Sequence, residues 1–230
     1  MLSERRPSFL VIGSQKSGMM SLFQVLRRHP QVFLPEVKEV NYFYSDHLYE
    51  RGPSWYADQF AAASDDVICG DVSPGYICHP RSPERIKRSI PNVKLILSLR
   101  DPVDRAHSQY WDNRRRLVEG HEFHELLAHP LHQTFVPGRT NYFSRGLYAT
   151  YLERYLRLFQ REQILVLWFS ELRQNPARFF ARCFDFLGID SAFDNEWMTK
   201  RANQRSVFMN PFFRFFFHRP QWAARLPTGA

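Results

Sequence analysis

The segment Ser8–Leu26 constrains the fold of this chain more than any other part of the sequence. It reads SFLVIGSQKSGMMSLFQVL, an apolar run (Phe9–Ile12), then a short loop with one lysine, then a stretch with helical spacing of apolar residues. The apolar run predicts a central strand of a parallel sheet, and Gly13 allows a sharp turn at its end. A helix that begins at Gly18 would direct backbone N–H groups and its positive dipole end into the loop, where Lys16 adds a charge. This arrangement predicts a binding site for phosphate or sulfate.

An ATP- or GTP-binding P-loop is the main alternative interpretation of this segment. Its pattern, G-x-x-x-x-G-K-[ST], places the lysine after the second glycine and a Mg²⁺-binding hydroxyl directly after the lysine. Here Lys16 precedes Gly18 and Met19 follows it, so the hydroxyl is missing at that place. The order of residues disfavours a metal-dependent NTPase, and we expect no metal site. Ordinary turn glycines beside a solvated lysine are the remaining alternative, so a second signal is needed.

The second signal is the segment VKLILSLRDPVDRAHSQYWDNRRR, in which an apolar strand (Val93–Leu99) leads directly into a helix. Asp101 can cap this helix, and proline suits its first position. Arg100 then lies at the carboxyl end of the strand, on the same sheet edge as the first loop, and Ser108 lies about two turns along the helix. Two anion sites at one sheet edge predict a nucleotide that carries phosphates at both ends of its ribose.

Four segments together give the chain a specific resemblance to a known family. They read QKSGMMSL (15–22), KEVNYF (38–43), GDVSPGYI (70–77) and LSLRDPVDRAHSQY (97–110). In this order they resemble the motifs K-x-G-T-T-[ST]-L, K-E-x-H-F-F, G-E-K-[ST]-P-x-Y and R-[DN]-P-x-x-R-x-x-S of sulfotransferases that use 3′-phosphoadenosine 5′-phosphosulfate (PAPS). The heparan sulfate type and its bacterial relatives are the most similar. The resemblance extends over residues 9–189, to the family's closing helix, strand, helix and F-L-G ending.

The alternation of apolar runs and helical stretches predicts an α/β fold, a parallel sheet with helices on both faces. The predicted strands are Phe9–Ile12, Val67–Cys69, Val93–Leu99 and Ile164–Phe169. The predicted helices that follow the first are Trp55–Ala63, Ser82–Ile90, Pro102–Leu117 and Arg145–Phe159. The resemblance implies a three-layer, P-loop-like version of this fold, with one sulfotransferase domain over residues 1–230. It fades after residue 189, and the chain stops early for this family, so we expect an incomplete carboxyl end.

The resemblance also implies a reaction, the transfer of a sulfuryl group from PAPS to an acceptor hydroxyl, which leaves 3′-phosphoadenosine 5′-phosphate (PAP). It assigns Lys16 to the charge on the leaving phosphate and Glu39 to the proton of the acceptor. Val37 and Val40 flank Glu39 and would partly shield it from water, whereas a surface ion pair with Lys38 is the alternative interpretation. The nucleotide contacts fall on Gln15, Lys16, Ser17, Gly18, Met19, Met20, Ser21, Arg100 and Ser108. The acceptor contacts fall on Lys38, Asn41, Ser73 and Tyr76.

The chain departs from the family pattern at a few positions, which leave alternatives open. Met19 and Met20 replace two threonines, so a non-catalytic relative that binds PAP or a sulfated ligand is one alternative. Asn41 replaces a histidine and Val72 a lysine, at positions that tend to face the acceptor. The heparan-type motifs favour a glycan as acceptor. A lipid or polyketide-like alcohol is the second choice, because of Val72 and of six phenylalanines between Phe208 and Phe217.

Composition places the chain among globular proteins with anionic partners. Its 230 residues are 44% hydrophobic and carry a formal net charge of +8, which suits an anionic nucleotide. Nucleic acid would also suit this charge, but no nucleic-acid-binding motif accompanies the arginine runs. No stretch of about twenty apolar residues predicts a transmembrane helix, and the first residues lack the apolar core of a signal peptide. We therefore expect a cytoplasmic protein; a lumenal catalytic domain that lacks its membrane anchor is the alternative.

The cysteines predict neither a metal site nor a disulfide framework. Cys69, Cys78 and Cys183 are widely spaced and form no C-x-x-C pair, so buried, reduced thiols are expected. Cys78 and His79 are adjacent, and a cysteine nucleophile with a histidine base is the minor alternative there.

Overall fold

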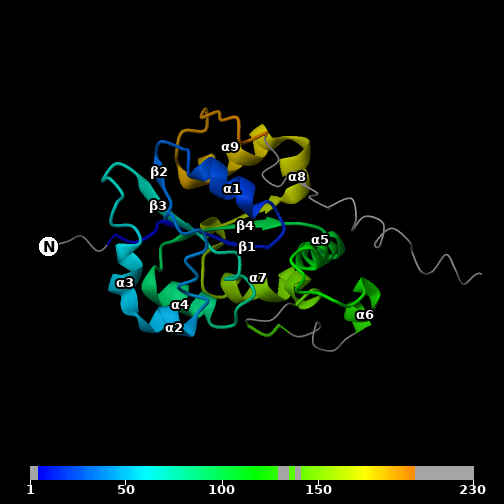
Figure 1. Cartoon of the computed structure of the whole chain (residues 1–230). Coiled ribbons are helices and arrows are strands. Elements are labelled where there is room, and N and C mark those ends of the chain that lie inside the picture. Colours follow the sequence, from blue (N-terminus) through cyan, green and yellow to red (C-terminus); the bar gives the residue numbers. More distant parts are fainter. Residues whose placement is uncertain (1–4, 129–134, 138–140, 200–230) are drawn as a thin grey trace, which may run out of the picture. The chain divides into compact units, whose positions relative to one another are not determined.

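A five-stranded parallel sheet forms the centre of the protein. The computed structural model describes residues 5–128, 135–137 and 141–199, and its sheet has the strand order β2-β3-β1-β4-β5 (Figure 1). The strands are β1 (Phe9–Gly13), β2 (Val32–Phe33), β3 (Ile68–Val72), β4 (Lys94–Leu99) and β5 (Ile164–Trp168). All neighbouring strands pair in parallel, which confirms the predicted α/β class.

Helices cover both faces of this sheet (Figure 1). One face carries α1 (Met19–Leu26), α8 (Phe169–Gln174) and α9 (Pro176–Leu187). The other carries α2 (Asp46–Glu50), α3 (Gly52–Asp58), α4 (Ser82–Ser89) and α7 (Tyr148–Leu156). The remaining elements are α5 (Pro102–Arg115), α6 (Phe123–Ala128) and the 3-10 turns η2 (Ser144–Gly146) and η3 (Arg161–Gln163). The sheet therefore separates two helical layers, as the three-layer prediction required.

The buried run of β1 shows why the sheet is central. Its side chains alternate between two apolar cores, so Leu10 and Ile12 pack with the α3, α4 and α7 side, whereas Phe9 and Val11 pack with the α1 and α9 side. A strand that is covered on both faces needs such a continuous apolar run. The ring of Phe9 also explains Gly70 on β3, because a Cβ at that position would lie within 2.4 Å of the ring.

The structure corrects several predicted boundaries. β3 runs over Ile68–Val72 instead of Val67–Cys69, because Gly70 and Asp71 pair with β1 although neither residue type favours a strand. The helix predicted at Trp55–Ala63 is α3 (Gly52–Asp58), and its continuation consists of turns. α7 begins at Tyr148, after η2, and not at Arg145. β2 is missing from the predictions because a two-residue strand has no periodicity to read.

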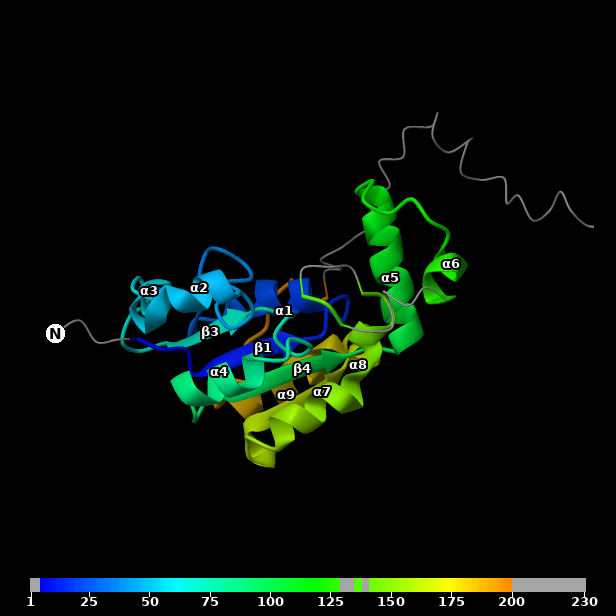
Figure 2. The same ribbon diagram turned by 90° about the horizontal axis from the view of Figure 1, so that it is seen from below.

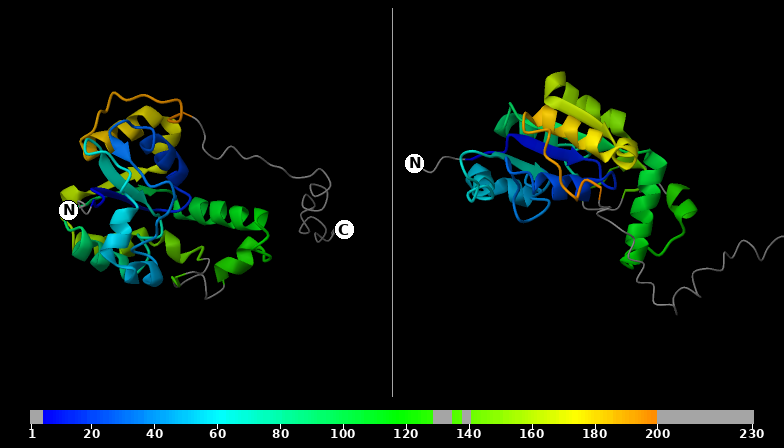
Figure 3. Two further views of the ribbon diagram at one scale, coloured as in Figure 1. Left: turned by 60° about the vertical axis from the view of Figure 1, so that its left-hand side comes forward. Right: turned by 90° about the horizontal axis from the view of Figure 1, so that it is seen from above.

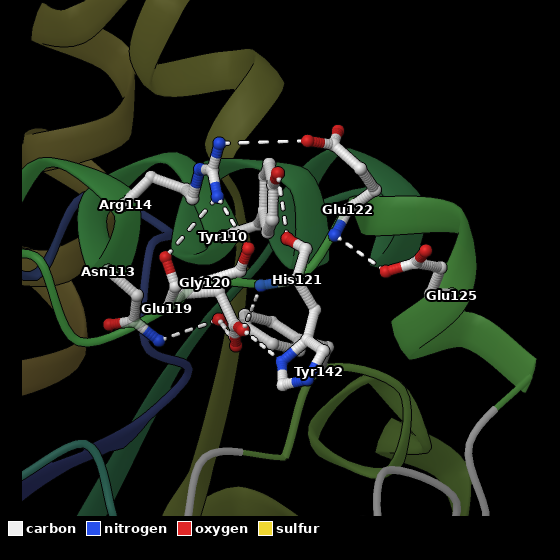
Figure 4. A network of polar contacts seen from close by, with 9 residues as sticks. All are labelled: Tyr110, Asn113, Arg114, Glu119, Gly120, His121, Glu122, Glu125 and Tyr142. Carbon is white, nitrogen blue, oxygen red and sulfur yellow. Dashed lines mark hydrogen bonds and ion pairs between the residues drawn. The ribbon is translucent and has the colours of Figure 1, made fainter.

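Helix α5 extends beyond the carboxyl edge of the sheet, with α6 beside it (Figures 2 and 3). Figure 4 shows the polar network that fixes the turn after α5: Arg114 donates to the carbonyl of Gly120 at 2.9 Å, and the Tyr142 hydroxyl donates to Glu119 at 3.0 Å. Asn113 on α5 in turn donates to the Tyr142 hydroxyl at 2.8 Å. The network ties the outer end of α5 to the chain around Tyr142, so the helix has a fixed direction.

No helix within the described ranges is both long and apolar enough to cross a bilayer. The phenylalanines from Phe208 to Phe217, which the sequence analysis singled out, lie outside the described residues.

Candidate active site

The predicted phosphate loop lies at the carboxyl edge of the sheet, where β1 sits between β3 and β4. Such a position in an open parallel sheet is where ligands bind, because the chain leaves the sheet in opposite directions there. Hydrogen bonds fasten the loop to β4: the Ser14 N–H donates to the Ser98 carbonyl at 2.8 Å, and the Ser98 hydroxyl donates to the Ser17 carbonyl at 2.7 Å. The loop therefore has a fixed shape.

Gly18 is the residue that turns this loop into α1. Its φ of +87° lies in the left-handed region, and a Cβ there would lie 2.6 Å from Leu172 on α8. Only glycine fits both conditions without strain. The first N–H groups of α1 have no acceptors within the helix, and no side chain caps them, so they are available to an anion at the loop.

Lys16 and Arg100 both lie at this loop, where the guanidinium of Arg100 contacts the backbone of Lys16. The Arg100 Nη1 donates to the Lys16 carbonyl at 3.4 Å, although 84 residues separate them. The guanidinium carbon of Arg100 lies 5.0 Å from the centre of the Phe169 ring, a cation–π contact that helps to hold the side chain in place. The Arg100 Nε is buried and has no hydrogen-bond partner among the described residues. A buried N–H group that lacks an acceptor indicates that an anionic ligand supplies one.

One face of α5 borders the two cations. Asp104, Ser108 and Asp112 are spaced by four residues, so they share that face. Asp104 Oδ2 lies 3.5 Å from Arg100 Nη2, and Asp112 Oδ2 lies 3.4 Å from Lys16 Nζ. The structure thus brings Ser108 to the helix face that faces the predicted nucleotide cations.

The segment that carries Glu39 is attached to the same sheet edge. The Asn41 N–H donates to the Ser73 hydroxyl at 3.0 Å, and the Ser73 N–H donates to the carbonyl of Val11 on β1 at 3.1 Å. Glu39 therefore lies two residues before Asn41, whose backbone is held beside the end of β1. Lys38 Nζ donates to Glu39 Oε1 at 2.8 Å, so the ion pair considered as the alternative interpretation does form.

Backbone conformation sets the predicted site apart from the rest of the protein. Among the described residues, the non-glycine residues with positive φ are Lys16 (68°), Glu39 (67°), Asn41 (56°) and Leu117 (59°). Such φ values are strained for lysine and glutamate, and strain of this kind gathers at functional sites. Three of the four lie in the two motifs for which the sequence predicts chemistry.

A buried carboxylate holds the acceptor-side segments together. Asp71 accepts hydrogen bonds from Tyr76 at 2.7 Å, Ser73 at 2.7 Å and Tyr56 at 3.2 Å. Burial raises the pKa of Asp71, and these three hydroxyl donors oppose the rise. Ser73 and Tyr76 are fully buried in this network, so in this structure their side chains offer no surface to the acceptor that the sequence assigned to them.

The side chains of three predicted nucleotide contacts, Ser17, Met19 and Met20, are wholly or partly buried. The Ser17 hydroxyl is buried beneath the loop, 2.7 Å from that of Ser14. Met19 packs into the core on the α9 side, and Met20 packs partly against it. The two methionine side chains that replace threonines thus pack into or against the protein core. The backbone N–H groups of these positions are left to face the loop. Gln15 and Ser21 are half-buried on the loop and the first turn.

Three residues of the site were missed from the sequence. Ser14 and Ser98 fasten the loop, and Asp112 pairs with Lys16. The spacing of four residues from Ser108 to Asp112 was the available signal for the third. Nothing local marks the two serines, because their contact joins the loop after β1 to β4 across 84 residues.

The structure excludes the minor alternative of a Cys78 nucleophile. The Cys78 thiol is buried and donates to the Gly75 carbonyl at 3.3 Å, and burial raises its pKa. Burial, followed by the charge of Arg85, lowers the pKa of His79 to about 4, and its Nδ1 accepts from the Arg81 N–H. The two side chains bond to different partners, so His79 does not act as a base on the thiol in this arrangement. Cys69, Cys78 and Cys183 are all unpaired and buried, which confirms the expected reduced thiols.

Comparison with known proteins gives this geometry a family. The family described as "Sulfotransferase domain" matches residues 6–210. The chain belongs to the sulfotransferase family. It is 31% identical over 187 residues to human heparan sulfate glucosamine 3-O-sulfotransferase 3B1, an alignment that covers 81% of this chain and 47% of the relative. This sulfotransferase chain thus spans about half the length of that curated relative.

Solved sulfotransferase structures share the fold. The crystal structure of a sulfotransferase from Alicyclobacillus acidocaldarius is 28% identical, with a TM-score of 0.74 over 92% of this chain and 90% of its own. Mouse sulfotransferase SULT7A1, solved in complex with PAP, has a TM-score of 0.56 at 17% identity, over 84% of this chain and 62% of its own. At 17% identity, the similarity to SULT7A1 shows a shared fold alone.

Proposed function

We propose that this sulfotransferase moves a sulfuryl group from PAPS to an acceptor hydroxyl. The observation that carries the proposal is the meeting of Lys16 and Arg100 at one loop beside the start of α1. Two cations and a helix start give two anion sites at one sheet edge, which matches the two phosphate groups of this nucleotide. The buried, unpartnered Nε of Arg100 supports the fit, because a 3′-phosphate would supply its missing acceptor.

The chain's residues divide the chemistry between them. PAPS supplies the sulfuryl group. Lys16 stabilises the charge that develops on the leaving phosphate oxygen, together with the N–H groups of Gly18, Met19 and Met20. Glu39 accepts the proton of the acceptor hydroxyl. The loop is fastened to β4 before the ligand arrives, so these donors are aligned in advance.

Arg100 and Ser108 hold the 3′-phosphate in this proposal, and the Phe169 ring fixes the direction of the guanidinium. On the acceptor side, Lys38 and Asn41 are the half-buried residues that a ligand can reach. Ser73 and Tyr76 act indirectly, since they bind Asp71 and the Asn41 backbone and so position the Glu39 segment.

A glycan is the acceptor that we favour. The support is the similarity to a heparan sulfate sulfotransferase and the net charge of +8, which suits an acidic sugar chain. A cytoplasmic location stays a prediction from the sequence.

Binding of PAP tests the nucleotide assignment first. PAP at a hundredfold excess over its Kd should raise the free energy of unfolding by about 2.7 kcal/mol. The measurement is the midpoint of thermal unfolding with PAP, with AMP, with ATP–Mg²⁺ and without ligand. Stabilisation by ATP–Mg²⁺ in place of PAP would favour the NTPase interpretation and contradict the proposal. PAP binding without any release of PAP from PAPS would identify the non-catalytic relative.

Replacement of Arg100 tests the 3′-phosphate site. We expect Arg100→Ala to weaken PAP binding by about thirtyfold, because charge-assisted hydrogen bonds are lost, and to leave AMP binding within about twofold. Calorimetric titration of both ligands gives the two values. Arg88→Ala removes an exposed arginine on α4 and is the matched control. Equal losses for PAP and AMP would show that Arg100 does not recognise the 3′-phosphate.

A further inference from the structure

Asp112 on α5 is the carboxylate that faces Lys16. Its Oδ2 lies 3.4 Å from Lys16 Nζ, and the two side chains are mostly buried, with exposed fractions of 27% and 22%. Within the described part of the chain, no other carboxylate reaches the Lys16 ammonium. Burial lowers the pKa of Lys16, and the charge of Asp112 is the main opposing influence. The pair therefore determines where the ammonium lies and helps to keep it charged.

Asp112 is itself supported by two further cations. Its Oδ1 lies 3.2 Å from Arg115 Nη2, and its Oδ2 lies 3.6 Å from Arg116 Nε. Burial raises the pKa of Asp112, but Lys16 and Arg115 outweigh this, so the pKa falls below its ordinary value. The carboxylate thus stays ionised next to a site built for an anion. Without the two arginines, its charge would repel that anion more strongly.

The geometry of an ammonium group explains what the Lys16–Asp112 contact can do. Lysine has three N–H donors at the end of a flexible four-carbon chain, and its direction is lost unless a partner holds it. One N–H directed at Asp112 leaves two for a ligand. Because α5 is fixed at its outer end by the network of Figure 4, the Asp112 side chain has a stable base from which to hold Lys16.

We propose that Asp112 is a positioning residue, which holds the Lys16 ammonium through their ion pair and thereby increases the rate of transfer at a cost in nucleotide affinity. The inference rests on the proposed function, because Lys16 must act on the 5′-phosphate. Two opposite effects follow. Loss of the carboxylate relieves its repulsion of the nucleotide and so tightens binding, while the released ammonium is less well aligned and the rate falls.

The test is the variant Asp112→Asn, which keeps the shape of the side chain. PAP and AMP should bind about fivefold more tightly, whereas adenosine 3′-phosphate, which lacks the 5′-phosphate, should bind unchanged. The kcat for PAP release from PAPS should fall about tenfold. The acceptor probe is a heparan sulfate oligosaccharide, or water if no oligosaccharide is sulfated. Asp112→Glu retains the carboxylate and should recover part of the lost kcat.

Asp46→Asn is the matched control, because Asp46 also pairs with two arginines, Arg81 and Arg85, but lies on α2 away from the loop. It should change neither PAP affinity nor kcat. Weaker PAP binding together with slower turnover in Asp112→Asn would mean a general structural role and would overturn the inference, as would unchanged values of both. If the unaltered protein binds no PAP, the proposed function itself fails. If it binds PAP and Asp112→Asn changes neither affinity nor kcat, only the inference about Asp112 fails.

Discussion

Replacement of Lys16 by methionine is expected to slow sulfuryl transfer by about a thousandfold, the size of effect seen when a preorganised donor to a developing anion is removed. Methionine keeps the length of the side chain and removes the charge. The Lys16 backbone adopts a φ of 68° and accepts a bond from Arg100, and neither feature depends on the ammonium group. The loop should therefore keep its shape, and kcat should fall much more than PAP affinity. Single-turnover measurement of PAP release from PAPS separates the two.

Lys87→Met on α4 is the control for this variant. It removes a lysine that contacts the Phe159 ring, on the face of the sheet opposite to α1. Its turnover should match that of the unaltered protein. A Lys16→Met protein that retains more than a tenth of the normal rate would show that the backbone N–H groups of α1 carry the charge stabilisation by themselves.

The second large effect is expected at Glu39. Glu39→Gln should reduce transfer by about a hundredfold or more, because glutamine cannot accept the proton of the acceptor hydroxyl. PAP affinity should stay the same, since Glu39 is assigned to the acceptor and not to the nucleotide. The left-handed backbone at Glu39 and the attachment of its segment through Ser73 place this carboxylate in a fixed position. The measurement is kcat with saturating PAPS, together with the Kd for PAP.

Glu36→Gln, three residues earlier and exposed, is the matched control for the loss of one negative charge. Glu39→Asp adds a second comparison, because it keeps a base but withdraws it by one methylene group. Transfer by Glu39→Gln at the normal rate would remove Glu39 from the mechanism and leave the Lys38–Glu39 ion pair as its role.

The parts of the site that the sequence predicted are those encoded in one continuous segment. The apolar run before Gly13, the helix that begins at Gly18 and the cap of α5 each follow from a few adjacent residues, and each is observed. Asp101, for example, accepts bonds from two N–H groups of α5, as its place before a proline predicted.

The parts that could not be predicted depend on contacts between distant segments. The hydroxyl groups of Ser73 and Tyr76 looked suited to an acceptor, but the burial of Asp71 between β1 and α3 recruits them as hydrogen-bond donors. A buried carboxylate is costly unless it is hydrogen-bonded, and this cost decides where the hydroxyls point. No local pattern shows which polar residue of a strand will be enclosed. Lys16 and Asp112 meet for a similar reason, since only the direction of α5 brings them together.

The dependence of the loop on β4 has a consequence for the newly made chain. Ser14, near the amino end, finds its hydrogen-bond acceptor at Ser98, and Lys16 finds Asp112 later still. A nascent polypeptide that has left the ribosome only as far as β3 contains every residue of the loop. It still lacks the residues of β4 and α5 to which the loop bonds. A nucleotide bound as proposed can therefore stabilise the native fold by mass action only after α5 has been synthesised.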